Sequence, residues 1–209
     1  MDKLSNKYID EIVLWNRKFN LTGLKTGEEI RLKLYDDSLN IAKAFDLSKK
    51  IEVVDIGCGA GFPGIPLKIE YPNIGLTLID SVAKKIDFVK HVINILGLND
   101  ARAIWGRAED IAKDHREQFD LAVSRAVAEL NTLCEYCLPF VKVGGSFIAQ
   151  KGPDIEEEIM SAEVAMKSLG GNLKEKVKVP SGYLVVIEKI KRTPKQFPRR
   201  AGIPAKRPL

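Results

Sequence analysis

Four glycines lie within eight positions of the stretch VVDIGCGAGFPGIP, residues 53–66, directly behind a short apolar run that contains an aspartate. Glycines at this density let the backbone pass close to a bound molecule, because no Cβ atoms stand in the way. The chemistry of this stretch therefore depends on which ligand the loop can accept. Three ligands come into question: a nucleotide phosphate, a dinucleotide, and a positively charged methyl donor.

The aspartate decides between these ligands. A phosphate-binding P-loop needs GxxxxGK[ST], and no Lys-Ser or Lys-Thr follows the glycines. A dinucleotide pattern, GxGxxG, is present at Gly59, Gly61 and Gly64. A second pattern, DxGxGxG, begins at Asp55 and Gly57. We expect the Asp55 carboxylate beside the loop to repel a pyrophosphate and to suit the ammonium and sulfonium charges of S-adenosylmethionine. S-adenosylmethionine is favoured, and a dinucleotide stays open as the alternative.

Two further segments end in polar residues that could bind the same ligand. Asp80 ends the next apolar run, LTLID, where its carboxylate can accept hydrogen bonds from ribose hydroxyls. Both remaining ligands contain a ribose, so Asp80 does not discriminate between them. The following run ends in Gly106-Arg107-Ala108-Glu109-Asp110, and in methyltransferase folds this loop meets the adenine. We expect these segments to form one binding site at the ends of neighbouring strands.

The order of the elements predicts an α/β fold with a mostly parallel sheet. Apolar runs alternate with amphipathic stretches, which implies right-handed crossovers and a sheet covered on both faces. The chain then ends in a hairpin around Pro180-Ser181-Gly182, a habit of class I S-adenosylmethionine-dependent methyltransferases with a Rossmann-like sheet. The predicted strands are 51–56, 76–80, 101–105, 119–124, 145–150, 173–179 and 183–190; the predicted helices are 3–20, 27–46, 63–70, 82–96, 108–115, 129–138 and 154–169.

Length and charge suggest how the chain is organised. Its 209 residues suit a single domain, which we divide into an N-terminal helical cap (1–47), a cofactor-binding core (48–190) and a basic tail (191–209). From Lys189 onward there are eight basic residues and no acidic one, which leaves 25 basic and 28 acidic residues elsewhere. A tail of this kind commonly meets phosphates.

Cysteine usage and hydropathy indicate the cellular compartment in which we expect the protein. Three cysteines do not suggest a disulfide framework, and no apolar run reaches the ~20 residues of a membrane span. We therefore expect a cytoplasmic protein without a membrane partner. Cys134 and Cys137 form a lone CxxC, which we interpret as small residues on one helix face. Neither histidine has ligand spacing, so no metal is expected.

At this point the motifs resemble a known family. DIGCGAGFPGIPL, LIDSVAKKIDFVK, GRAED, FDLAVSRAVAEL, IAQKG and KRTPKQFPRRAGIPAKRPL occur in the order found in the bacterial GidB/RsmG family of 16S ribosomal RNA guanine-N7 methyltransferases. The resemblance covers nearly the whole chain. It implies S-adenosylmethionine as donor, S-adenosylhomocysteine as product, and 16S rRNA or a 30S particle as partner, with no obligate protein partner evident.

The same resemblance assigns residues. Gly57 and Phe62 match loop positions at the cofactor, and Gly59 lies between them. Ala108 and Glu109 match the pair that contacts adenine. Arg125, in a Ser-Arg-Ala motif, matches an arginine at both cofactor and active site, so it is the expected catalytic residue.

Guanine N7 chemistry fits this set of residues. N7 carries a free lone pair, so methylation needs no general base, only alignment of N7, methyl carbon and sulfur. Because side chains cannot read the deep major groove of RNA, the guanine must be unpaired or flipped outward. The expected RNA contacts are Lys151, Arg199, Arg200 and Lys206. Deleting 191–209 should then leave cofactor affinity nearly intact. Two alternatives remain open here: a methyltransferase with another substrate, and a noncatalytic RNA- or dinucleotide-binding module.

Overall fold

A seven-stranded sheet forms the centre of the molecule. The structure is a computed structural model, and it describes residues 3–125 and 128–209. The strand order is β3-β2-β1-β4-β5-β7-β6. The first five strands pair in parallel, whereas β7 runs antiparallel to both β5 and β6, as predicted. The strands are β1 (Glu52–Ile56), β2 (Gly75–Asp80), β3 (Ala101–Trp105), β4 (Phe119–Arg125), β5 (Val141–Lys151), β6 (Gly171–Val179) and β7 (Gly182–Lys189).

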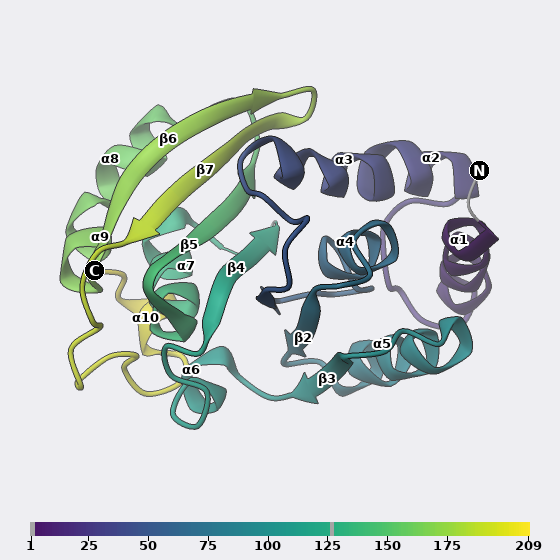
Figure 1. Cartoon of the computed structure of the whole chain (residues 1–209), viewed down its shortest axis with the longest axis horizontal. Coiled ribbons are helices and arrows are strands. Elements are labelled where there is room, and N and C mark those ends of the chain that lie inside the picture. Colours follow the sequence, from purple (N-terminus) through teal and green to yellow (C-terminus); the bar gives the residue numbers. More distant parts are fainter. Residues whose placement is uncertain (1–2, 126–127) are drawn as a thin grey trace.

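Both faces of the sheet are covered, which explains why its central strands are mostly apolar. Alternating residues of one strand enter different clusters: Val53 packs with the helices of one face, and Val54 with those of the other. In Figure 1 the two helical layers lie on the right and left of the sheet. The first layer holds α4 (Gly64–Glu70) and α5 (Ala83–Leu96), and the second holds α6 (Ala108–Ile111), α7 (Leu130–Cys137), a 3-10 turn (Leu138–Phe140), α8 (Glu156–Ser161) and α9 (Glu163–Ser168).

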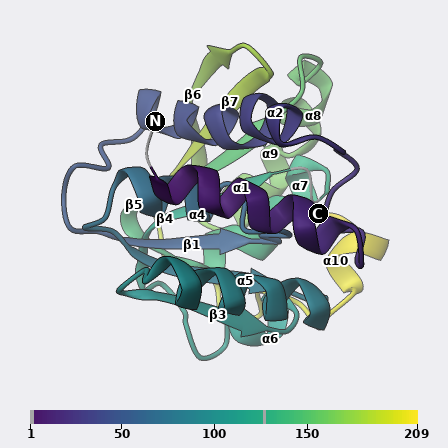
Figure 2. The same cartoon turned by 90° about the vertical axis from the view of Figure 1, so that its right-hand side faces the viewer.

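The N-terminal helices lie across the first face. Helix α1 (Lys3–Asn16) passes in front of α4 and lies above α5 in Figure 2, and Tyr8 and Ile12 on its inner side are fully buried. The Tyr8 hydroxyl donates to the carbonyl of Ala60 in the glycine loop at 2.7 Å. The second predicted helix is an unbroken helical stretch over residues 27–43, but its hydrogen-bond pattern changes along it. It consists of α2 (Gly27–Ile30), a π-helical turn (Arg31–Tyr35), α3 (Asp36–Ser38) and a 3-10 turn (Leu39–Lys43).

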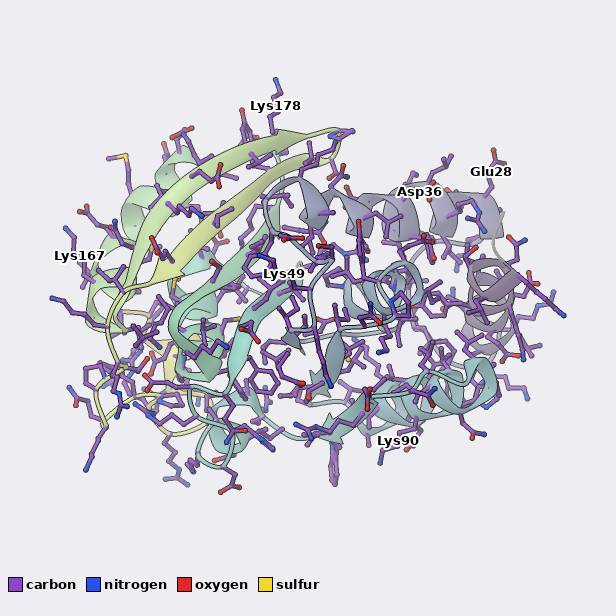
Figure 3. The ribbon with its side chains drawn as sticks, viewed as in Figure 1. Glu28, Asp36, Lys49, Lys90, Lys167 and Lys178 are labelled. Atoms are coloured by element: carbon purple, nitrogen blue, oxygen red, sulfur yellow. The ribbon has the colours of Figure 1, made fainter. Side chains whose placement is uncertain are left out.

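Many charged side chains of these elements lie at the periphery. Glu28, Asp36, Lys90, Lys167 and Lys178 are all exposed and point outward from the ribbon in Figure 3. Residues 1–188 contain 25 basic and 28 acidic residues, so the net charge of the body is small.

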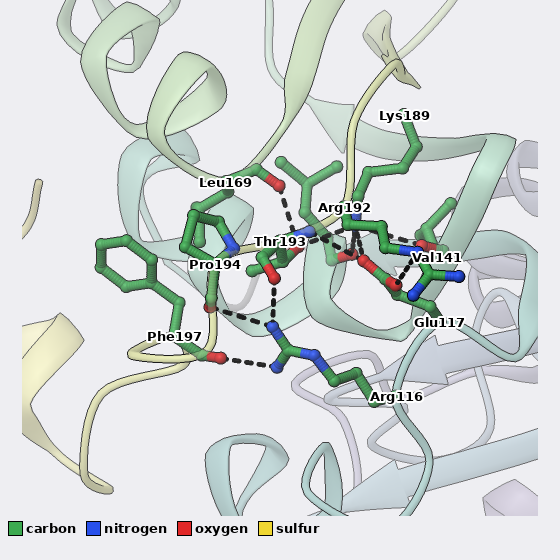
Figure 4. Close-up of polar contacts among 10 residues, drawn as sticks. Arg116, Glu117, Val141, Leu169, Lys189, Arg192, Thr193, Pro194 and Phe197 are labelled. Carbon is green, nitrogen blue, oxygen red and sulfur yellow. Dashed lines mark hydrogen bonds and ion pairs between the residues drawn. The ribbon is translucent and has the colours of Figure 1, made fainter.

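The basic tail packs against the body. It includes a short helix, α10 (Ile203–Lys206), that was not predicted. Its root is a polar cluster shown in Figure 4, where the Arg116 guanidinium donates to the carbonyls of Thr193, Pro194 and Phe197. Beside it the fully buried Lys189 ammonium donates to the Thr193 hydroxyl at 2.7 Å. Many carbonyls of the tail thus have protein partners, and the tail is an ordered layer in this structure. The division into cap, core and tail remains a prediction.

Candidate active site

A cavity of about 430 Å³ opens at the carboxyl-terminal edge of the parallel strands. Its walls come from the loops after β1, β2 and β3 and from the end of β4, where open α/β sheets bind ligands. The volume lies in the range of small-molecule sites. Seven of the predicted cofactor residues line it: Gly57, Gly59, Phe62, Asp80, Ala108, Glu109 and Arg125. The N-terminal segment adds Leu21, Thr22 and Leu34, which the sequence did not indicate.

The glycine loop offers bare backbone to this cavity. Gly57 and Gly59 have positive φ angles of 73° and 58°, which side-chain-bearing residues rarely adopt. No heavy atom lies within 4 Å of a Cβ placed on Gly59, so a ligand can approach there. The amide groups of Gly57 and Cys58 donate to the carbonyl of Ile79 on β2, at 2.8 and 3.1 Å. These donors are therefore already used and do not form a nest for phosphate.

Asp80 joins the loops after β1 and β2. Its side-chain oxygens accept hydrogen bonds from the amides of Gly59, at 2.9 Å, and Val82, at 2.8 Å. Each carboxylate oxygen can accept a further bond, so Asp80 keeps capacity for a ligand hydroxyl in the cavity it lines. The two amide bonds fix the direction in which that capacity points.

Asp55 lies beneath the loop and is not among the residues that line the cavity, so the structure does not bring this predicted residue to the cavity wall. The side chain is fully buried, and its Oδ2 accepts the amide of Gly64 at 2.8 Å. Within the described residues its Oδ1 has no hydrogen-bond partner, and burial raises the pKa of Asp55 to about 7. The carboxyl group occupies the amino end of α4, where a dinucleotide fold would hold pyrophosphate. A dinucleotide is disfavoured by occupancy of this position, whatever the charge on Asp55.

Arg125 faces the cavity from the end of β4. Its guanidinium lies 5.1 Å from the centre of the Phe62 ring and donates to the carbonyl of Leu34 at 3.2 Å. Burial lowers the pKa of Arg125, and the Asp37 carboxylate at 3.7 Å opposes that shift. The helical cap therefore orients this arginine through contacts that sequence spacing did not reveal. Ala126, the last residue of the Ser-Arg-Ala motif, lies outside the described residues.

The tail reaches the wall of the cavity. Glu109 is 2% exposed, and its Oε1 accepts the amide of Gly202 in the tail at 2.9 Å. Ala108 lies beside it at the first turn of α6. Deleting 191–209 would remove this bond, so the expectation that truncation spares the cofactor site does not fit the structure. Point substitutions are the cleaner test.

The four predicted RNA-binding residues divide into two kinds. Lys151 is largely buried, pairs with Glu158 and donates to the carbonyl of Ala128 at 2.7 Å. Arg199 binds the nearly buried Glu135, with Nη2 to Oε2 at 2.6 Å. Both side chains already have partners within the protein, so the structure does not leave these two predicted RNA-binding residues free to meet RNA.

Arg200 and Lys206 form the second kind, since both are exposed on the tail. A phosphate can reach their charges without breaking an interaction that the fold uses. These two residues therefore keep the predicted capacity to meet RNA.

The cysteines and acidic groups supply no further centre. Cys134 and Cys137 are buried on α7 in the core, as predicted for small residues of one helix face. Across residues 3–125 and 128–209, no group of three or more His, Cys, Asp or Glu side chains is placed to hold a metal ion. In the same part of the chain no helix has the length and apolar character that a membrane span requires.

With this geometry in place, comparison with known proteins identifies the family. The family described as rRNA small subunit methyltransferase G matches residues 1–182. The chain belongs to this family. A relative from Alkaliphilus metalliredigens, named ribosomal RNA small subunit methyltransferase G, is 47% identical over 97% of this chain and 88% of its own length. The relative of that name from Clostridium novyi is 46% identical over 100% of this chain and 90% of its own length.

Solved structures support the fold. A putative S-adenosyl-L-methionine-dependent methyltransferase from Methanococcus maripaludis has a TM-score of 0.63 at 16% identity, over 92% of this chain and 96% of its own. A protein from M. jannaschii, solved in complex with AdoMet, has a TM-score of 0.58 at 20% identity, over 75% of this chain and 77% of its own. The fold is that of class I methyltransferases.

Proposed function

We propose that this protein transfers a methyl group from S-adenosylmethionine to N7 of a guanine in 16S ribosomal RNA. The observation that carries this is one cavity that brings together the glycine loop, Asp80, Glu109 and Arg125 in a chain of the rRNA small subunit methyltransferase G family. The donor fits the residues present: bare backbone beside Gly59, carboxylates for hydroxyl and amine donors, and a cation for a carboxylate.

Each part of the cavity has a proposed task toward the donor. Asp80 accepts the ribose hydroxyls, Ala108 and Glu109 meet the adenine, and the loop at Gly57–Gly59 passes beneath the methionine portion. Asp55 supports the loop from below by holding the amide of Gly64. When bound, S-adenosylmethionine supplies a methyl group on a sulfonium that is also the leaving group.

Arg125 is the proposed catalytic residue. The bond to Leu34 and the ion pair with Asp37 fix its guanidinium at the cavity wall beside Phe62. From there it can hold guanine O6 or the methionine carboxylate, which aligns the N7 lone pair with the methyl carbon. No proton has to leave N7, so the site works by proximity and orientation without a general base.

The RNA approaches along the tail. The exposed charges of Arg200 and Lys206 are the proposed phosphate contacts, while Arg199 and Lys151 keep their partners and shape the surface. The target guanine must be unpaired or extruded to bring N7 to the cavity. We propose that the enzyme acts in the cytoplasm on free 16S rRNA or on a 30S particle, and that it needs no second protein.

The test uses purified protein with labelled S-adenosylmethionine and either naked 16S rRNA or 30S particles. Label at guanine N7, lost in an Arg125→Ala variant that still folds, is the expected result. A protein that binds S-adenosylhomocysteine yet labels neither substrate would contradict the rRNA assignment.

A further inference from the structure

Trp105 stands out as a large apolar side chain left in solvent. It is the last residue of β3, the edge strand, and it is 64% exposed. The register pairs Trp105 with Asp80, and Ile56 with Ile79, so Trp105, Asp80 and the glycine loop lie in one row along the carboxyl edge. An exposed tryptophan is unusual on a protein surface, and this one lies at the edge that carries the cavity.

The ring of Trp105 is held in place. Its indole Nε1 donates to the carbonyl of Ser81 at 3.1 Å. Ser81 and Val82 line the cavity, whereas Trp105 is not among the lining residues, so the ring lies outside the rim and not inside it. Val82, itself 45% exposed, continues the apolar surface. The indole is thus a flat apolar surface beside the cavity, and its bond to Ser81 gives the ring a defined orientation.

Cationic groups flank this ring along the chain. Lys84 and Lys85 follow Ser81-Val82 in the first turn of α5, and Arg107 lies two residues beyond Trp105. Arg107 and Lys84 are exposed, and Lys85 and Arg107 line the cavity. Of the neighbouring acidic residues, Asp80 and Glu109 are buried, and the exposed Asp110 is paired with Lys113 at 2.8 Å. An aromatic platform among cations is what a single-stranded nucleic acid needs: stacking for a base and charge for its backbone.

We propose that Trp105 stacks on an unpaired RNA base near the target guanine, which extends the proposed function to a second nucleotide. Three strand spacings separate β3 from β4 in the sheet order, so Trp105 and Arg125 stand about 14 Å apart. One base cannot occupy both positions. The guanine enters the cavity at Arg125, and a neighbouring base of the same single-stranded segment rests on Trp105.

The first test compares Trp105→Leu with Trp105→Phe. Leucine keeps an apolar side chain but offers no ring, so affinity for rRNA should fall about 5- to 150-fold, the range that corresponds to loss of one base–aromatic stack. Phenylalanine keeps a ring and loses the bond to Ser81, so it should retain most of the affinity. Affinity for S-adenosylhomocysteine and the salt dependence of RNA binding should stay unchanged in both. Met160→Ala, which removes a side chain 75% exposed on α8, is the matched surface control.

The second test reads the ring directly. The chain has two tryptophans, and Trp15→Phe leaves Trp105 as the sole fluorophore of that kind. At saturating S-adenosylhomocysteine, a single-stranded 16S rRNA fragment that contains the unmodified target guanine should quench the emission of Trp105. The same fragment paired into a duplex should not.

The outcomes separate this proposal from the function it extends. Methylation by the wild type together with unchanged RNA affinity in Trp105→Leu overturns stacking and leaves the function standing. Equal losses of RNA affinity in the Leu and Phe variants would assign Trp105 a structural role, which also overturns the stacking proposal. A loss seen with 30S particles but not with naked RNA would assign the ring to a protein contact. Failure of the wild type to bind or methylate rRNA refutes the proposed function itself.

Discussion

Two adjacent arginines in the tail should respond differently to the same substitution. Arg199 is bound to Glu135 on α7, whereas Arg200 is exposed. Arg199→Ala should therefore lower the free energy of unfolding without changing how RNA affinity depends on salt. Arg200→Ala should weaken RNA binding and leave the stability unchanged. The two variants remove the same side chain at neighbouring positions, so each is the other's control.

The geometry sets the size of the stability loss. The Arg199 side chain makes three bonds to Glu135: Nε to Oε1 at 2.9 Å, Nε to Oε2 at 3.0 Å, and Nη2 to Oε2 at 2.6 Å. Glu135 is 1% exposed, so the variant leaves a buried carboxylate with only the amide of residue 199 as partner in this pair. Breaking a buried pair costs about 3–5 kcal/mol. The arginine side chain is 26% exposed and water can enter, so we expect about 2 kcal/mol.

Urea unfolding and thermal melting measure the first effect. A loss of about 2 kcal/mol corresponds to a fall in Tm of about 4–8 °C for a chain of this length. RNA titrations at several salt concentrations measure the second, where loss of one phosphate contact reduces the slope by about 0.7. If Arg199→Ala melts like the wild type and instead reduces the salt slope, the structural assignment of Arg199 is refuted.

Three further substitutions probe buried charge. Burial raises the pKa of Asp55 to about 7, above its value in the unfolded chain. As the pH rises from about 4 to 7, the free energy of unfolding of the wild type should therefore fall relative to that of Asp55→Asn, by up to about 4 kcal/mol. Urea unfolding at several pH values measures this difference. Parallel pH curves would refute this. Asp80→Asn should weaken S-adenosylhomocysteine binding about 10- to 150-fold by calorimetry, with the exposed Asp110→Asn as an unaffected control. Burial lowers the pKa of Lys189 to about 8, so stability should rise from pH 8 toward pH 10, and Lys189→Met should abolish that rise in melting scans.

The parallel sheet and most of the cavity could be predicted from the sequence because their signals are local. Alternation of apolar runs with amphipathic helices specifies the layers, and strand-end residues such as Asp80 must meet at one edge whatever the details. Asp55 looks like a second such residue, but it lies inside β1 and is covered by α4. Both residues are aspartates, so the residue type does not distinguish them. The position within the strand decides that Asp80 lines the cavity and that Asp55 is buried beneath the loop.

Long-range partners could not be predicted in this way. Nothing in the sequence distinguishes Arg199 from Arg200. Only the fold brings Glu135, which is 64 positions away in the sequence, into contact with Arg199. Asp37 and Leu34 likewise meet Arg125 from the helical cap, with 91 positions between Leu34 and Arg125. The spacing of residues in the sequence does not reveal such pairings. A count of basic residues therefore overestimates how many side chains of the tail are free to bind RNA.

The bond from Gly202 to Glu109 also sets an order on the protein's synthesis. The ribosome adds Gly202 after every residue that lines the cavity, because the last of those residues in the sequence is Tyr136. A product of premature termination would contain the glycine loop, Asp80 and Arg125, yet Glu109 and Glu135 would lack their partners from the tail. The hydrogen bond that Gly202 donates to Glu109 can therefore form only after all the residues that line the cavity have been translated.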